Sequence, residues 1–205
     1  MVDNQKPLCY APFITKKGHI FMEKKKFRTV DLAYIGLFVA LMTVCSWISI
    51  KTPWDISFTL QTFAVFAAVG TLGLLRGTMV VIIYILLGLV GVPVFSNFGA
   101  GPAALFGTTG GYIVGFIFSA VIVGVIQKFF GNKLYVSIIA MIIGLIACYA
   151  FGTAWFVIIY TQNKGPVGIM TALGWCVFPY IIPDLVKLVV AAFVSKRVSG
   201  LINRE

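Results

Sequence analysis

The stretch "CVFPYIIPDLVKLVVAAFV" (176–194) places two charges inside an otherwise unbroken apolar run. Asp184 and Lys187 are three positions apart, so on a helix their side chains lie on the same face and can meet. Each charge would cost about 2.5–3.5 kcal/mol at the centre of a lipid-facing helix. We therefore expect both to face an interior cavity and to bind something polar. An ion pair that only fixes the register of the helix is the alternative.

The rest of the chain has the composition of an integral membrane protein. Of its 205 residues, 60% are hydrophobic and 11% are charged, and the mean hydropathy is +1.02. Water-soluble domains of this length do not carry so much apolar surface, so the excess must face lipid. Four cysteines form no CxxC pair and show no metal-ligand spacing. We expect no metal site, and we expect the three cysteines in apolar segments to pack in the core.

Six apolar segments predict an all-α bundle of six transmembrane helices. They run over 31–50, 58–75, 77–92, 109–127, 134–160 and 172–196. The bundle is expected to fill 29–200, between a basic N-terminal extension over 1–28 and a short tail over 201–205. Proline suits the first turn of a helix. Pro183 therefore predicts that the last helix begins near position 183, with 172–182 as a shorter element that caps the site.

The net charge of +10 reflects membrane topology rather than nucleic-acid binding. Basic residues lie in the N-terminal extension and in short loops, and they are not interleaved with aromatic residues on one face. If both termini are cytoplasmic, thirteen of the sixteen lysines and arginines fall inside, as the positive-inside rule requires. We predict a multi-pass protein of a prokaryotic plasma membrane. The cluster "EKKKFR" (23–28) is either an anchor at anionic headgroups or part of a leader-like extension.

The segment "GVPVFSNFGAGPAALFGTTGGY" (91–112) carries no charge. It is too apolar for a solvated loop and too rich in glycine and proline for a helix. Non-helical backbone at membrane depth is tolerated only where protein covers it or where it lines a cavity. The segment is therefore predicted to be a lid or a pocket wall. A tight reversal between two helices is the alternative.

Missing motifs favour binding over catalysis. The chain contains no GxxxxGK[ST] phosphate loop, no HExxH and no GxSxG, and its one histidine, His19, lies in the N-terminal extension. One acidic residue in the expected spans leaves no carboxylate pair for general acid–base chemistry. We expect no catalytic residue and no cofactor. The alternative from a different class is a membrane enzyme that acts on a lipid-soluble substrate, with Asp184 as its base.

Four motifs, in this order and spacing, resemble the BioY family, the biotin-specific S components of energy-coupling-factor (ECF) transporters. They are "TLQTFAVFAAVGTLG" (59–73), "GVPVF" (91–95), "GTTGGYIVGF" (107–116) and "PDLVK" (183–187). The resemblance implies an S-component fold of six helices that captures biotin near the outer face of the membrane. It also implies a partner module, made of one transmembrane coupling subunit and two ATPases, that supplies the energy. An S component for another vitamin, such as riboflavin or thiamine, is the alternative within this class.

The resemblance also implies which residues bind biotin. It places Asp184 and Lys187 in the biotin site, together with Gln61 of the QT motif and with Asn97 and Tyr112 of the segment that closes over the ligand. Two departures bear on the geometry of the lid more than on the substrate. Threonine replaces the proline of the usual GPTGGY motif, and the usual PGD reads IPD here, with its proline displaced by one position.

The first apolar segment carries a further implied site. S components of this kind use small residues four apart in the first helix to dock on the coupling subunit, and Gly36 and Ala40 keep that spacing. Small residues allow two helices to approach closely. Ordinary packing within the chain is the alternative.

Overall fold

The computed structural model describes residues 28–50, 52 and 56–202, so most of the expected N-terminal extension and C-terminal tail lies outside it. Five helices in this part are long and apolar enough to cross a membrane. They are α1 (Thr29–Trp47), α2 (Gln61–Val90), α4 (Gly110–Phe130), α5 (Leu134–Lys164) and α7 (Phe178–Ile202). The prediction of an all-helical membrane protein is thereby confirmed.

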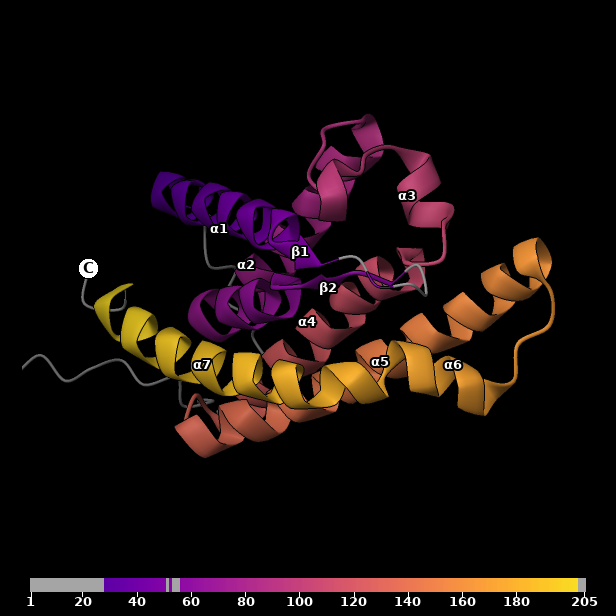
Figure 1. The fold of residues 1–205 in the computed structure, drawn as a ribbon. Helices are drawn as coiled ribbons and strands as arrows, with labels where there is room; N and C mark the ends of the chain where they lie inside the picture. Colours follow the sequence, from indigo (N-terminus) through magenta and orange to yellow (C-terminus); the bar gives the residue numbers. More distant parts are fainter. Residues whose placement is uncertain (1–27, 51, 53–55, 203–205) are drawn as a thin grey trace, which may run out of the picture.

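The long helices lie side by side, and their ends gather at two ends of the bundle (Figure 1). At one end, Arg76 forms an ion pair with Asp31 at 3.0 Å. At the same end, Lys196 Nζ donates to the carbonyl oxygen of Asn132 at 2.9 Å, and Asn132 Nδ2 donates to the carbonyl oxygen of Gly70 at 3.3 Å. These contacts tie α1, α2, α7 and the connection between α4 and α5 together where the described chain begins and ends.

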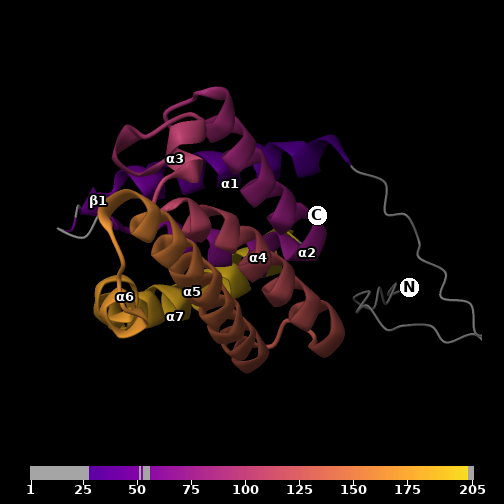
Figure 2. The same ribbon diagram turned by 90° about the vertical axis from the view of Figure 1, so that its right-hand side faces the viewer.

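The opposite end carries the short elements. Strands β1 (Ser49–Ile50) and β2 (Phe58–Thr59) pair antiparallel, with Ser49 opposite Thr59. The 3-10 helix η1 (Ser96–Phe98) and the helix α3 (Pro102–Phe106) follow α2, and α6 (Ile169–Cys176) follows α5. Figures 1 and 2 both show α3 on the side of α1, and α6 on the opposite side in line with α7.

Helix α2 is broken at Gly73, whose φ of 79° and ψ of −176° are open in practice only to glycine. A Cβ atom on Gly77 would lie 2.6 Å from the Cα atom of Val69. Along a straight helix those two residues would be separated by a rise of about 12 Å. The chain therefore turns back at Gly73, and the arms 61–72 and 74–90 pack against each other. They correspond to the predicted segments 58–75 and 77–92.

The last helix begins earlier than predicted. Helix α7 starts at Phe178, and Pro183 lies inside it rather than at its start. The amide groups of Tyr180 and Ile181 both donate to the carbonyl oxygen of Val177, at 2.9 and 3.1 Å, and so begin the helix before the proline. A proline this close to a helix start removes only one hydrogen bond of the helical ladder, which packing can offset.

Two further corrections concern α1 and α3. Asp31 lies in the first turn of α1 and is 5% exposed, so the spans hold a second acidic residue besides Asp184. Asp31 stands at the edge of its apolar segment and so does not interrupt the apolar run. It pairs there with Arg76. Part of 91–112 is helical as well: Pro102 occupies the first turn of α3, where its missing N–H costs no hydrogen bond.

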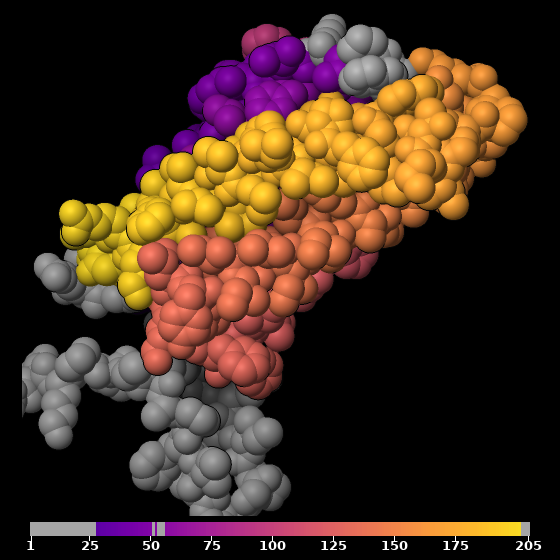
Figure 3. Space-filling view, turned by 60° about the horizontal axis from the view of Figure 1, so that its bottom comes forward, coloured from indigo at the N-terminus to yellow at the C-terminus, as the bar shows by residue number. Residues whose placement is uncertain are grey.

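The core lies between α2 and the helices that surround it. Its largest fully buried side chains include Tyr84, Phe66, Phe95 and Phe156. Cys45, Cys148 and Cys176 are free and buried, which confirms that they pack. On one outer face α7 and α5 lie side by side (Figure 3). Aliphatic side chains of α7 such as Val186 are exposed, as expected of a lipid-facing helix.

Candidate functional site

Asp184 and Lys187 form a buried ion pair on α7. Asp184 is 4% exposed and Lys187 is 8% exposed, and Nζ lies 2.7 Å from Oδ1 of the carboxylate. The same Nζ donates to the carbonyl oxygen of Thr59 at 2.6 Å and lies 3.8 Å from the ring centroid of Phe58. The pair thus links α7 to β2, and the cation is stabilised by a carboxylate, a carbonyl dipole and an aromatic face.

Tyr149 on α5 completes this arrangement. Its hydroxyl donates to Oδ2 of Asp184 at 2.5 Å, so both carboxylate oxygens hold a partner. Sequence reasoning missed Tyr149, because nothing in the apolar run around it indicates a partner on another helix. A hydroxyl in the middle of a span was the one available signal, since such a group needs a hydrogen-bond partner in a dry interior.

A cavity of about 70 Å³ opens beside the ion pair. It has room for about two water molecules, so a larger ligand enters only if part of the lining moves. Among the described residues, no group of histidine, cysteine, aspartate and glutamate is placed to hold a metal ion. The polar side chains of the lining come from α2, α4, α5, α7 and the segments at this end of the bundle; they include Ser57, Gln61, Thr62, Ser96, Thr109, Tyr112, Tyr149, Asp184 and Lys187.

Gln61 and Tyr112 both line this cavity and are both held firmly. Gln61 is 5% exposed, and its Nε2 donates to the hydroxyl of Tyr84 at 2.6 Å. The ring of Tyr112 packs over Gly152, where a Cβ atom would lie 2.3 Å from Tyr112 Cδ1. The hydroxyl of Tyr112 shares a hydrogen bond of 2.9 Å with Thr153 Oγ1.

The remaining residues named by the resemblance do not themselves line the cavity, although Ser57, to which Asn97 bonds, does. Asn97 is not part of its lining, which Ser96 reaches instead. The Nδ2 group of Asn97 donates to Ser57 Oγ at 2.8 Å and so links two segments at this end of the bundle. Gly36 and Ala40 are exposed on the outer face of α1, and nothing lies within 4 Å of the position that a Cβ atom on Gly36 would take.

The segment between α2 and α4 is anchored at its start. Trp47 Nε1 donates to the carbonyl oxygen of Pro93 at 2.8 Å, and Tyr84 donates to that of Val94 at 2.8 Å. The ring of Phe95 is 1% exposed and rests on Gly88, where a Cβ atom would lie 2.0 Å from Phe95 Cζ. The segment up to position 95 is therefore part of the core.

The same segment is more exposed after position 95, although it is still anchored: the Gly101 N–H donates to the carbonyl oxygen of Gly88 at 2.7 Å, and Trp155 Nε1 donates to that of Gly107 at 3.0 Å. Asn97 and Phe98 have φ angles of 56° and 61°, in the left-handed backbone region that residues other than glycine rarely adopt. Phe98 is 63% exposed and Phe106 is 66% exposed. Strained backbone and exposed aromatic side chains next to a cavity are typical of a segment that moves when a ligand binds.

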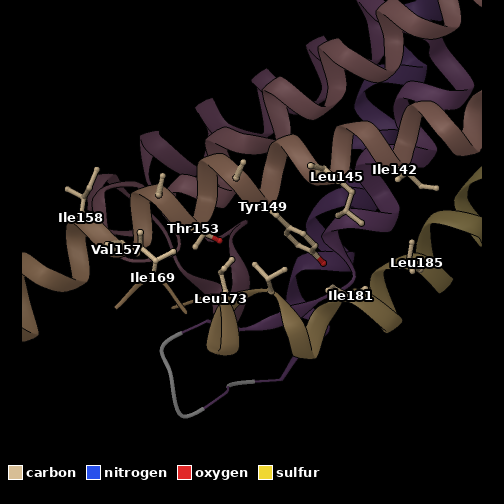
Figure 4. Close-up of a pocket in the computed structure, with 14 residues that line it drawn as sticks. Ile142, Leu145, Tyr149, Thr153, Val157, Ile158, Ile169, Leu173, Ile181 and Leu185 are labelled. Atoms are coloured by element: carbon tan, nitrogen blue, oxygen red, sulfur yellow. The ribbon is translucent and has the colours of Figure 1, made fainter. Parts of the chain in front are cut away.

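A second, larger hollow lies between α5 and the pair α6–α7 (Figure 4). We refer to this hollow, of about 790 Å³, as the lateral groove. Its lining is almost entirely aliphatic and includes Val157, Leu173 and Ile181. Two residues, Leu145 and Tyr149, line both hollows. Tyr149 therefore separates the polar cavity from the lateral groove.

Comparison with known proteins connects this site to a family. The profile described as "BioY family" matches residues 22–204. The chain is 38% identical over 172 residues to the "Biotin transporter BioY" of Thermotoga maritima, a match that covers 83% of this chain and 96% of the relative. It is 34% identical over 170 residues to the "Probable biotin transporter BioY" of Pyrococcus horikoshii, with coverage of 83% and 96%.

The fold has a solved counterpart. The crystal structure of the S-component for biotin from an ECF-type ABC transporter superposes with a TM-score of 0.74 at 23% sequence identity, covering 83% of this chain and 91% of that one. At this identity the likeness establishes the fold alone. Together with the family match and the two sequence relatives, it confirms the resemblance drawn from the four motifs: the chain belongs to the BioY family.

Proposed function

We propose that this chain is the biotin-binding membrane subunit of an ECF transporter, which captures external biotin and delivers it inward. The observation that carries the proposal is the buried pair of Asp184 and Lys187 beside a small polar cavity. The ureido ring of biotin offers two N–H donors and one carbonyl acceptor. A carboxylate next to an ammonium group matches that pattern, because one accepts only and the other donates only. Both sequence relatives carry the name of biotin transporter.

Biotin entry requires the lid to open. The cavity of about 70 Å³ is too small for a fused bicyclic ring with a side chain. The part of the lid proposed to open is the stretch around Asn97 and Phe98, where the backbone is strained and Phe98 is exposed, since Phe95 itself is packed into the core. Ser96 and Thr109 would then meet the ligand from the lid, while Gln61 and Tyr112 form the fixed wall.

The chain crosses the membrane six times in this proposal, with both termini in the cytoplasm. The turn at Gly73 supports the count, because it divides α2 into two packed arms that run in opposite directions. Basic residues support the orientation: Arg76 and Lys196 both make their contacts at the end of the bundle that lies away from the cavity. That end faces the cytoplasm under the positive-inside rule, which leaves the cavity facing outward in a prokaryotic plasma membrane.

Energy comes from partners in this proposal, since the chain contains no phosphate loop. The partners are a transmembrane coupling subunit and two ATPases. The exposed face of α1 around Gly36 and Ala40 is the proposed contact with the coupling subunit, because small residues let a second helix approach closely. The subunit binds and carries biotin without chemical conversion.

Equilibrium binding of radiolabelled biotin to the purified protein tests the function directly. We expect tight binding at one molecule per chain, with the ligand recovered unchanged and with no competition from excess riboflavin or thiamine. Competition by either vitamin would indicate an S component of different specificity. Absence of biotin binding would refute the proposal, and a chemically altered ligand would point to the membrane enzyme instead.

A further inference from the structure

Tyr149 occupies the part of Asp184 that Lys187 leaves open. Lys187 Nζ holds Oδ1 at 2.7 Å, and the Tyr149 hydroxyl holds Oδ2 at 2.5 Å. An N–H group of a ligand that approaches Oδ2 therefore meets the tyrosine first. The hydroxyl makes to Oδ2 the same kind of hydrogen bond that an N–H group of a ligand would make. It also satisfies one oxygen of a buried carboxylate.

The space that a ligand needs points to the same residue. Two other side chains of the cavity wall are fixed in place: Gln61 is hydrogen-bonded to the buried Tyr84, and the Tyr112 ring packs against Gly152. Tyr149 differs, because the lateral groove of about 790 Å³ lies on its other side. Figure 4 shows its ring reaching from α5 toward α7 beside Ile181, with the groove continuing along α5 past Leu173 and Val157.

We propose that Tyr149 is a placeholder for the ligand. In the empty site its hydroxyl caps Asp184, and when biotin binds, the ring moves into the lateral groove and yields Oδ2 to an N–H group of the ligand. One hydrogen bond to the carboxylate replaces another, so no buried charge is left unpaired at either stage. The inference rests on the proposed biotin function and adds a residue that tunes affinity by competing with the ligand.

The variant Tyr149→Phe tests the proposal, because the affinity for biotin should rise if Tyr149 is displaced by the ligand and should not rise if Tyr149 stays in place and orients Asp184. It keeps the ring and removes the hydroxyl, so biotin no longer has to displace a hydrogen bond. We expect biotin to bind about tenfold more tightly and to associate faster. Equal or weaker binding would overturn the placeholder. If Tyr149 instead stays in place and orients Asp184, removing its hydroxyl cannot strengthen biotin binding.

Tyr160→Phe is the matched control. It deletes a hydroxyl from the same helix, outside the linings of both hollows, and should leave the affinity unchanged. The wild-type chain separates the two proposals. If it fails to bind biotin, the proposed function fails; if it binds and Tyr149→Phe does not bind more tightly, only the placeholder fails.

Movement of the ring can be followed independently with a thiol probe in the lateral groove. Ile181→Cys puts a thiol beside the Tyr149 ring, and Ile158→Cys puts one far along the same groove (Figure 4). Labelling with a lipid-soluble maleimide is measured with and without saturating biotin, and the parent chain corrects for its native cysteines. We expect biotin to slow labelling of the first variant alone. Equal labelling of Ile181→Cys with and without biotin would overturn the proposed movement.

Discussion

The hydrogen-bond partners of Asp184 explain how this conspicuous charged residue is accommodated inside an apolar helix. Asp184 accepts from Lys187 and Tyr149, and Lys187 donates in addition to the carbonyl oxygen of Thr59. A pair that only fixed helix register would not need a polar cavity at its side. The arrangement suits a site that presents an acceptor and a donor to one planar ligand group.

Replacing Asp184 by asparagine should weaken biotin binding by about tenfold to a hundredfold. The shape of the side chain is kept, but a charge-assisted acceptor worth about 1.5–3 kcal/mol is lost. Equilibrium binding to the purified variant measures the change. Asp31→Asn is the matched control, since that carboxylate is also buried and paired but lies at the far end of the bundle, and it should leave the affinity unchanged.

The double variant Asp184→Asn with Lys187→Met separates a binding pair from a structural one. If Lys187 only neutralises Asp184, removing both charges leaves nothing unpaired and restores binding. If both residues contact biotin, the double variant binds more weakly than either single one. We expect the second result, with the fold retained. Full binding by the double variant would show that the pair is structural and that biotin binds elsewhere.

At the residue scale, the sequence identifies the buried charged residues of the site better than it identifies the groups that form hydrogen bonds with them. Asp184 and Lys187 are conspicuous because their burial in an apolar helix has a high free-energy cost. Tyr149 and the carbonyl of Thr59 are not, because a tyrosine is ordinary in a span and a backbone carbonyl has no sequence signature. Asn97 stays a predicted ligand contact: it is not in the cavity lining, but its side chain donates to Ser57, which is.

The proposed lid is the element whose backbone we expect biotin to order most. Its start is fixed by Phe95 and Trp47, and its later part carries two residues in the left-handed conformation. Hydrogen exchange should therefore slow on addition of biotin over 96–108, with little change at 92–95, which is already protected. Equal exchange over 96–108 with and without biotin would favour a plain reversal between two helices.

The break in α2 is an element-scale feature with its own test. Gly73→Ala forces an alanine into a backbone region that only glycine occupies readily, at a cost of order 1–3 kcal/mol. No atom lies within 4 Å of the added methyl group, so strain alone accounts for the loss. We expect a lower apparent melting temperature in detergent. Gly200→Ala, in an open helical position of α7, should not lower it and serves as the control.

Apolar segments predict helices well and helix ends poorly. The two arms of α2 could be foreseen as separate segments, because Gly73 and Arg76 interrupt the apolar run between them. The start of α7 could not, since the preference of proline for first turns is a tendency that packing overrides here. The segment 91–112 has a composition that disfavours helix, yet it forms the short α3, because Pro102 suits a first helical turn and packing of the buried Leu105 offsets the cost of nucleation.

At the scale of the whole molecule, the two ends of the bundle are built differently. The cavity and the lid lie at one end. At the other, Gln127 donates to Ser137, which donates to Asn132, and Asn132 in turn bonds to Gly70. Nearby helices meet in very close contact, as where Gly70 faces Ser195. Within the described part of the chain, these contacts pack the helices closely at the end away from the cavity, which is the cytoplasmic end in the proposed orientation.

This close packing leads to the last prediction, which concerns energy. In the proposed orientation, release of biotin inward requires the polar contacts at the end away from the cavity to rearrange, or the whole bundle to change its orientation in the membrane. Binding energy alone cannot drive that change through repeated cycles, and the sequence contains no GxxxxGK[ST] phosphate loop. In liposomes that contain this chain alone, we expect biotin binding without uphill accumulation, even when ATP or an ion gradient is supplied. Adding the coupling subunit and both ATPases should produce accumulation that depends on ATP. Sustained accumulation by the lone chain would show that the end away from the cavity opens without a partner, and the assignment as a subunit dependent on its module would then be wrong.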